Sequence, residues 1–192
     1  MIPNATDETR FYAKDRAACR EKLDWDPAQF IVAFTGSFIE RKGVRKLCAA
    51  LDRFDDVYSV FIGTGEQQPD CKNIIHCGRV PNAQMCDYLN AADIFVLPTL
   101  AEGCCNAIVE AVCCGLPVVS ADRAFNYDVL DCGNSILIDP LSEDEIYEAI
   151  RKLKDDEQLR SRLSRGCLDR AKELTLDARV DKINAFIGKF LG

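Results

Sequence analysis

Short apolar runs recur along the chain, and longer segments of mixed character separate them. The apolar runs are rich in β-branched and aromatic residues, and each ends at glycine, proline or a polar residue. Such runs are typical of strands buried on both faces of a parallel sheet. We therefore expect strands, some with their following turn, at 29–37, 57–66, 73–80, 93–99, 117–121 and 135–139.

The intervening segments place apolar residues at helical spacing. In 40–54 these residues are Val44, Leu47, Cys48 and Leu51, which fall on one face of a helix. Glycine and proline stop the helix expected at 106–114. The pattern predicts further helices at 82–92, at 125–133 (a short one) and, with charged amphipathic character, at 142–155, 157–173 and 177–190.

Strand and helix alternate about six times, and this alternation decides the fold class. It predicts an α/β, Rossmann-like, doubly wound parallel sheet of about six strands with helices on both faces. The expected strand order is 3-2-1-4-5-6. With 192 residues and no internal repeat, we expect a single domain. Its parts are a linker and first helix (1–28), an alternating core (29–140) and C-terminal helices (141–192).

Composition narrows the class of protein. Hydrophobic residues make up 48% of the chain and charged residues 29%, which is typical of a globular domain. A net charge of −7 argues against nucleic acid as the main partner. The eleven cysteines lack zinc-type spacing and accompany a single histidine, His76. We therefore expect buried, reduced thiols, no metal site and a cytoplasmic location.

The stretch "TLAEGCCNAIVEAVCCGLPVVS" (99–120) places two carboxylates, Glu102 and Glu110, among small and apolar residues. Burying a carboxylate is unfavourable unless a partner satisfies it. Glu102 belongs to the loop at the carboxyl edge of the sheet, and Glu110 to a helix that we expect to be buried on all sides. Free N–H groups from about Cys105 to Ile108 would favour an anion there. A sugar joined to a phosphate fits this arrangement.

A basic pair strengthens the prediction of an anion site. Arg41 and Lys42 precede the helical part of 40–54, where the helix dipole disfavours cations. The turn "GTGE" (63–66) reaches the same edge but is a weak signal. Each of these residues also has a simpler explanation when it is taken alone. Glu110 could be a helix surface residue or part of a structural salt bridge. Glu102 could be a solvated acid in a loop, and Arg41 and Lys42 a solvated pair on the surface.

Seven motifs occur in the order found in family 4 glycosyltransferases. They are "IPNATD", "TGSFIERKG", "FIGTGE", "GRVP", "LNAADIFVLPTLAEGCCNAIVEA", "CGLPVVS" and "GNSILIDP". The spacing E-x7-E from Glu102 to Glu110 resembles the signature of that family. The resemblance implies the C-terminal, donor-binding half of a GT-B enzyme, a nucleotide-sugar donor, retention of anomeric configuration, and neither a cofactor nor a catalytic metal.

The resemblance also implies a role for each site residue. Lys42 and Glu102 would be catalytic: Lys42 would contact the donor diphosphate and Glu102 the sugar hydroxyls. Glu110 would hold the ribose hydroxyls. The remaining nucleotide-sugar-binding positions are Gly36, Ser37, Arg41, Arg79, Val80, Gly103, Cys104, Cys105 and Asn106, with Arg79 and Val80 near the base and the backbone of 103–106 facing sugar and phosphate.

Two departures from the family pattern stand out. Gly36-Ser37 replaces the usual Gly-Arg, so a diphosphate cation is missing unless Arg41 compensates. The start "IPNATDETRFY" resembles the linker that enters the second domain of the family. We therefore expect the N-terminal acceptor domain to lie outside this sequence, and this domain to bind donor weakly without transferring sugar. The last helix of this sequence resembles the helix that, in the family, returns to pack on the N-terminal domain. We therefore expect hydrophobic surface to be exposed on this helix. The parent enzyme could lie at the inner face of the membrane and serve polysaccharide biosynthesis.

Three alternatives remain open. A non-catalytic nucleotide-sugar-binding module would show the same motifs, and turnover by the full-length parent separates it from a transferase. The sequence "DWD" (24–26) suggests a metal-dependent transferase of the other main fold, although it precedes the first strand. A dinucleotide-dependent oxidoreductase is the weakest alternative, because G-x-G-x-x-G is missing after the first strand.

Overall fold

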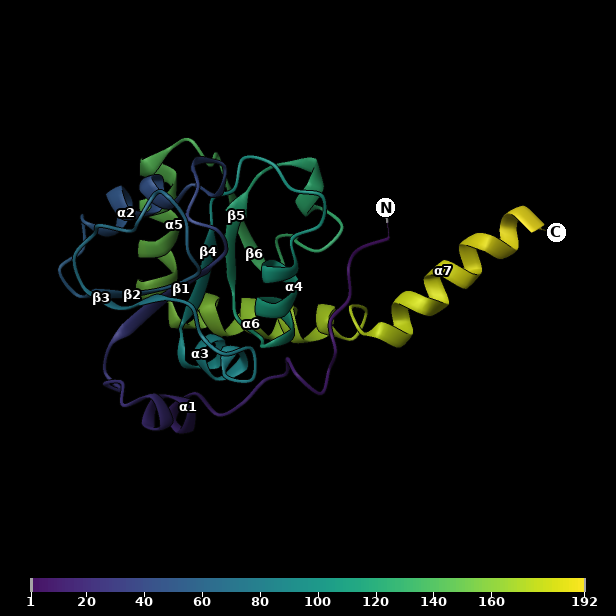
Figure 1. The fold of residues 1–192 in the computed structure, drawn as a ribbon, viewed down its shortest axis with the longest axis horizontal. Coiled ribbons are helices and arrows are strands. Elements are labelled where there is room, and N and C mark those ends of the chain that lie inside the picture. Colours follow the sequence, from purple (N-terminus) through teal and green to yellow (C-terminus); the bar gives the residue numbers. More distant parts are fainter. Residues whose placement is uncertain (1, 192) are drawn as a thin grey trace.

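The computed structural model describes residues 2–191, with side chains described up to 189. A six-stranded parallel sheet with the order β3-β2-β1-β4-β5-β6 forms its centre, so the predicted strand order is confirmed (Figure 1). The strands are β1 (Phe30–Thr35), β2 (Val57–Ile62), β3 (Ile74–Gly78), β4 (Ile94–Leu97), β5 (Val118–Ala121) and β6 (Ser135–Ile138).

The helices cover both faces of this sheet. Strand order runs outwards from β1 in one direction and from β4 in the other, so right-handed crossovers carry the helices to opposite faces. Accordingly α2 packs on α5, α4 on α6 and α1 on α3. The helices are α1 (Arg16–Leu23), α2 (Val44–Leu51), α3 (Met85–Ala91), α4 (Asn106–Cys113), α5 (Glu143–Asp155), α6 (Glu157–Ala171) and α7 (Leu176–Leu191).

Two helix predictions need correction. The expected helix 40–54 is divided into a 3-10 turn, Glu40–Lys42, and α2. Gly43 separates them with φ 72°, and a Cβ there would lie 2.3 Å from the Pro98 carbonyl oxygen. The expected helix 125–133 is only a 3-10 turn, Ala124–Asn126, because the Asn134 side chain takes backbone groups that a longer helix would pair. Its amide donates to the Val129 carbonyl, and its oxygen accepts from the Asp131 N–H.

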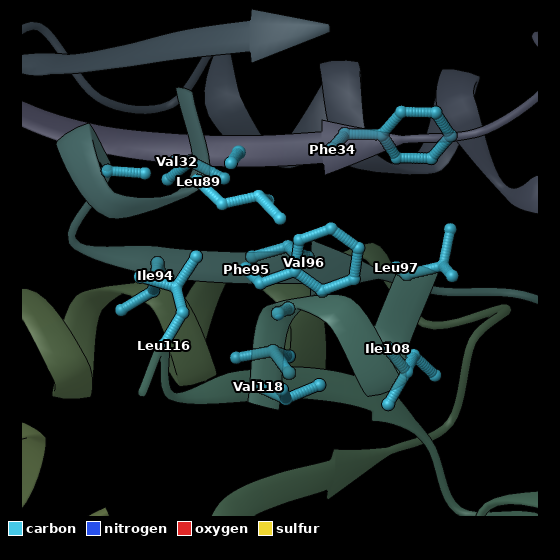
Figure 2. Packing of buried hydrophobic residues seen from close by; sticks show 14 of the residues in the cluster. Val32, Phe34, Leu89, Ile94, Phe95, Val96, Leu97, Ile108, Leu116 and Val118 are labelled. Atoms are coloured by element: carbon cyan, nitrogen blue, oxygen red, sulfur yellow. The ribbon is translucent and has the colours of Figure 1, made fainter. Parts of the chain in front are cut away.

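The core lies between the central strands and the helices that cover them. Figure 2 shows Phe34 of β1, Phe95 and Leu97 of β4, and Ile108 of α4 packed within one cluster. Strand β4 is buried along its whole length, as its apolar run predicts. All eleven cysteines are free thiols and eight are buried, in agreement with the expected role as small apolar residues. The core fixes the strand ends and therefore the loops that follow them.

Helix α7 extends away from the rest of the domain (Figure 1). Among its side chains up to residue 189, large apolar ones are exposed at Leu176, Val180, Ile183, Phe186 and Ile187. This exposed face agrees with the hydrophobic surface expected for the last helix. Within residues 2–191, none of the helices combines the length and the apolar character that a membrane span requires.

Candidate functional site

The loops after β1 and β2 pack directly against each other at the carboxyl edge of the sheet. The Gly36 N–H donates to the Ile62 carbonyl at 2.9 Å, and the Phe38 N–H donates to the Thr64 carbonyl at 2.9 Å. A Cβ on Gly63 would lie 1.8 Å from the Gly36 carbonyl oxygen. The "GTGE" turn is therefore glycine-rich because two backbones touch there, which the sequence alone could not distinguish from an ordinary tight turn.

A hollow of about 390 Å³ opens beside this contact. It lies at the ends of β1, β2 and β3 and gathers four of the predicted positions, namely Gly36, Ser37, Arg79 and Val80. The exposed Arg79 guanidinium approaches the Thr64 hydroxyl at 3.5 Å. The lining combines an apolar side with backbone and hydroxyl groups, a surface suited to a planar, partly polar group.

Lys42 connects this hollow to the loop before α4. Its aliphatic stem passes beneath Gly36, whose ideal Cβ position lies 3.6 Å from Cε of Lys42. The Lys42 ammonium lies 2.5 Å from Oε1 of Glu102 and 3.9 Å from Sγ of Cys105. Both charged side chains are 12% exposed, so this pair is largely shielded from water.

Glu102 is neutralised within the chain, so the carboxylate does not need the sugar hydroxyls of a donor to satisfy it. Besides Lys42, its Oε1 lies 3.3 Å from the Arg41 guanidinium and accepts from the Thr99 hydroxyl at 3.0 Å. Arg41 also donates to the Ala101 carbonyl. Within residues 2–191, Oε2 of Glu102 has no hydrogen-bond partner. One carboxylate oxygen thus holds the loop, and the other remains available.

Sequence analysis missed the pairing of Glu102 with Lys42, since the residues are 60 positions apart. The nearest sequence signal is Thr99, three residues before Glu102, whose hydroxyl reaches the carboxylate. The alternative site at "DWD" is distant from this cluster: Asp24 ends α1 and Asp26 accepts from the Ala28 N–H at 2.8 Å, before β1 begins.

The tip of α4 presents backbone donors to the same region. Among residues 2–191 no acceptor pairs with the N–H groups of Gly103, Cys104, Cys105 or Asn106. The Ile108 N–H, expected to be free, donates instead to the Cys105 carbonyl at 3.1 Å. A Cβ on Gly103 would meet nothing within 4 Å, so the fold itself does not require glycine there. Unpaired donors at a helix start favour an anion.

Glu110 lies one turn further along α4, on the same helix face as Asn106. It is partly buried, and within residues 2–191 its carboxylate makes no hydrogen bond or ion pair. Burial raises its pKa to about 7, and the positive charge of Arg10 opposes this shift. The expectation that α4 is buried on all sides is wrong at this face, because Asn106 is exposed and Glu110 is only partly covered.

We expect the Glu110→Gln variant to be more stable than the natural chain at pH 8 and equally stable near pH 4. A carboxyl whose folded pKa lies above its unfolded value of 4.5 lowers the free energy of unfolding as pH rises from 4.5 to 7. A pKa shift of this size lowers the free energy of unfolding by at most roughly 3 kcal/mol. Denaturant unfolding between pH 4 and 8 measures the free energy of unfolding of both chains. Glu21→Gln is the control, because Glu21 is exposed on α1. Parallel curves for Glu110→Gln and the natural chain would contradict the raised pKa.

The chain is similar in sequence to known glycosyltransferases. The chain is 32% identical over 173 residues to the lipopolysaccharide core biosynthesis glycosyltransferase LpsE of Rhizobium meliloti, covering 85% of this chain and 50% of the relative. It is 29% identical over 182 residues to a GDP-mannose-dependent alpha-mannosyltransferase of Corynebacterium glutamicum, covering 90% and 43%. The chain thus spans about half the length of the curated relatives it matches.

Solved structures and a family model agree with this assignment. The crystal structure of Anabaena Alr3699/HepE in complex with UDP-glucose superposes with a TM-score of 0.84 at 20% identity, covering 98% of this chain and 57% of that one. This likeness supports the GT-B fold. The family model described as "Glycosyl transferases group 1" matches residues 29–156, two thirds of the sequence. The chain therefore belongs to the group 1 glycosyl transferases.

Proposed function

We propose that this domain binds a nucleotide-sugar in the crevice between the hollow at β1–β3 and the tip of α4. In the parent protein it would be the donor half of a retaining glycosyltransferase. The observation that carries the proposal is the Lys42 ammonium, shielded from water between the Glu102 carboxylate and the start of α4. A cation beside unpaired backbone N–H groups fits a diphosphate.

The proposed contacts follow from this geometry. The base would enter the hollow beside Arg79 and Val80, and the diphosphate would lie between Lys42 and the backbone of 103–106. The sugar hydroxyls would donate to the unpaired Oε2 of Glu102. Glu110 would accept from the ribose. The open space beside Gly103 would let the ligand approach the backbone closely.

In the transfer step, the bond between the anomeric carbon and the donor phosphate would break and its electron pair would pass to the phosphate. The acceptor oxygen would bond to the same face of that carbon, and its proton would go to the leaving phosphate. Lys42 and the N–H groups at α4 would stabilise the developing negative charge. These groups supply positive charge from the chain itself, so we propose no catalytic metal.

The relatives leave the donor base open. One relative is named for dependence on GDP-mannose, and one similar structure contains UDP-glucose. We propose a nucleoside diphosphate hexose as the donor class and polysaccharide biosynthesis as the setting, in line with a relative named for lipopolysaccharide core biosynthesis. The acceptor site would belong to a further domain of the parent, and the exposed apolar face of α7 would pack on that domain.

A thermal-shift measurement tests the proposal directly. A ligand that binds only the folded state raises the melting temperature, by an amount that grows with its concentration. We expect UDP-glucose or GDP-mannose to raise the Tm of this chain, with the same shift in EDTA. No shift with either donor would contradict donor binding, and a shift lost in EDTA would favour a metal-dependent site. Sugar transfer by the full-length parent distinguishes the enzyme from the non-catalytic module.

A further inference from the structure

The N-terminal segment contacts the tip of α4 through Asn4. Its Nδ2 donates to the Cys104 carbonyl at 3.1 Å and to Oδ1 of Asn106 at 2.8 Å. The Asn4 backbone N–H also donates to Sγ of Cys104 at 3.1 Å. These contacts join residues about 100 positions apart at the loop 100–105, here called the donor loop.

The other end of the same amide contacts α7. Oδ1 of Asn4 accepts from the Arg179 guanidinium at 2.9 Å. Because a guanidinium can only donate, Arg179 selects the amide oxygen and directs the Asn4 NH₂ group towards the donor loop. The Thr6 N–H, which donates to the Leu174 carbonyl at 3.0 Å, anchors the same segment beside the start of α7. Arg179 therefore determines which way the Asn4 amide faces.

The bond to the Cys104 carbonyl fixes the direction of a donor on the opposite side. In a trans peptide the C=O and the following N–H point in opposite directions. Holding the Cys104 carbonyl towards Asn4 thus points the Cys105 N–H away from the N-terminal segment, and that N–H has no partner within residues 2–191. The donor loop has no regular secondary structure of its own to supply this orientation.

We propose that Asn4 is a positioning residue that orients the Cys105 N–H for the donor diphosphate, and that Arg179 couples this orientation to α7. The inference rests on the proposed donor site. A change in the position of α7 that breaks the Arg179 contact would release the Asn4 amide and lower diphosphate affinity. The loop and the helix are thus linked through one side chain, that of Asn4, to which the sheet topology gives no role.

The Asn4→Asp variant gives the sharpest test. Aspartate keeps the shape of the side chain and an ion pair with Arg179 but cannot donate to the Cys104 carbonyl. We expect the affinity for UDP or GDP, measured by calorimetry, to fall about fivefold, while the Tm and the affinity for the bare nucleoside are retained. Unchanged diphosphate affinity would overturn the positioning role, and so would an equal loss for the nucleoside.

Two variants on α7 test the coupling. We expect Arg179→Ala to lower UDP or GDP affinity about two- to threefold and Arg179→Lys, which can still donate, to restore it. Lys182→Ala is the matched control, because it removes a cation from the same helix without touching Asn4. Equal effects of Arg179→Ala and Lys182→Ala would contradict the coupling.

Amide hydrogen exchange separates failure of this inference from failure of the proposed function. If neither UDP nor GDP binds the natural chain, the donor assignment fails, but the loop can still be measured. The Ile108 and Val109 N–H groups donate to the Cys105 carbonyl, so their exchange reports how firmly the end of the donor loop is held. We expect these two amides to exchange faster in Asn4→Asp and Arg179→Ala than in Lys182→Ala. Equal exchange in all three variants would overturn the positioning role without reference to any ligand.

Discussion

Replacing Lys42 with alanine is expected to weaken binding of UDP or GDP by about 10- to 100-fold, the loss typical of a charge-assisted hydrogen bond. Lys42 is the shielded cation of the cluster, because its side chain is 12% exposed while that of Arg41 is 49% exposed. Binding of the bare nucleoside should change little, since the hollow at β1–β3 is formed by other residues. Calorimetric titration with nucleoside and nucleoside diphosphate measures both.

Lys46→Ala is the matched control for this variant. Lys46 belongs to α2, is 42% exposed and pairs with Glu143 at 2.8 Å on the surface. Its removal should leave diphosphate affinity unchanged, because exposed ion pairs contribute little and the side chain is not part of the cluster. Retained diphosphate affinity in Lys42→Ala, or equal losses in both variants, would overturn the phosphate role of Lys42.

The ion pair with Glu102 makes the Lys42 result more informative. In the structure Glu102 engages the ammonium that we propose for the diphosphate. Glu102→Gln should therefore free Lys42 and keep or strengthen nucleoside diphosphate binding, while it weakens the contribution of the sugar. Comparison of UDP with UDP-glucose, or GDP with GDP-mannose, separates these two effects.

Gly63→Ala is expected to give the largest loss of stability, roughly 3 kcal/mol or more. The new Cβ would lie 1.8 Å from the Gly36 carbonyl oxygen, and Gly63 has φ 154°, which side chains rarely adopt. The nearest atoms to this Cβ belong to the Gly36 backbone and not to a flexible side chain, so they cannot easily move away. For a chain of this length the Tm should fall by on the order of 10 °C, measured by calorimetry or circular dichroism.

Gly103→Ala is the control for the loss of a glycine as such. Its Cβ would meet nothing within 4 Å and its backbone is not at positive φ, so the Tm should remain close to that of the natural chain. A Tm fall of similar size in both variants would show that the backbone contact between Gly36 and Gly63 is not responsible.

The fold was predictable because its signals are local. A continuous apolar run predicts a strand buried on both faces, and alternation with amphipathic helices requires parallel strands with right-handed crossovers. The expected helix at 125–133 failed for a reason of the same local kind. Side-chain amides such as that of Asn134 compete for backbone groups, and hydrophobic periodicity does not report this competition.

The sequence by itself determined the strand order, the edge of the sheet where Lys42, Glu102 and α4 would meet, and the exposed apolar face of the last helix. Only the tertiary structure decided that Glu102 is already paired with Lys42, that Glu110 is unpaired with a raised pKa, and that Asn4 joins the donor loop to Arg179. The physical reason is one of range. Burial patterns repeat within a few residues, whereas a contact between residues 60 to 175 positions apart depends on where the whole core places their segments.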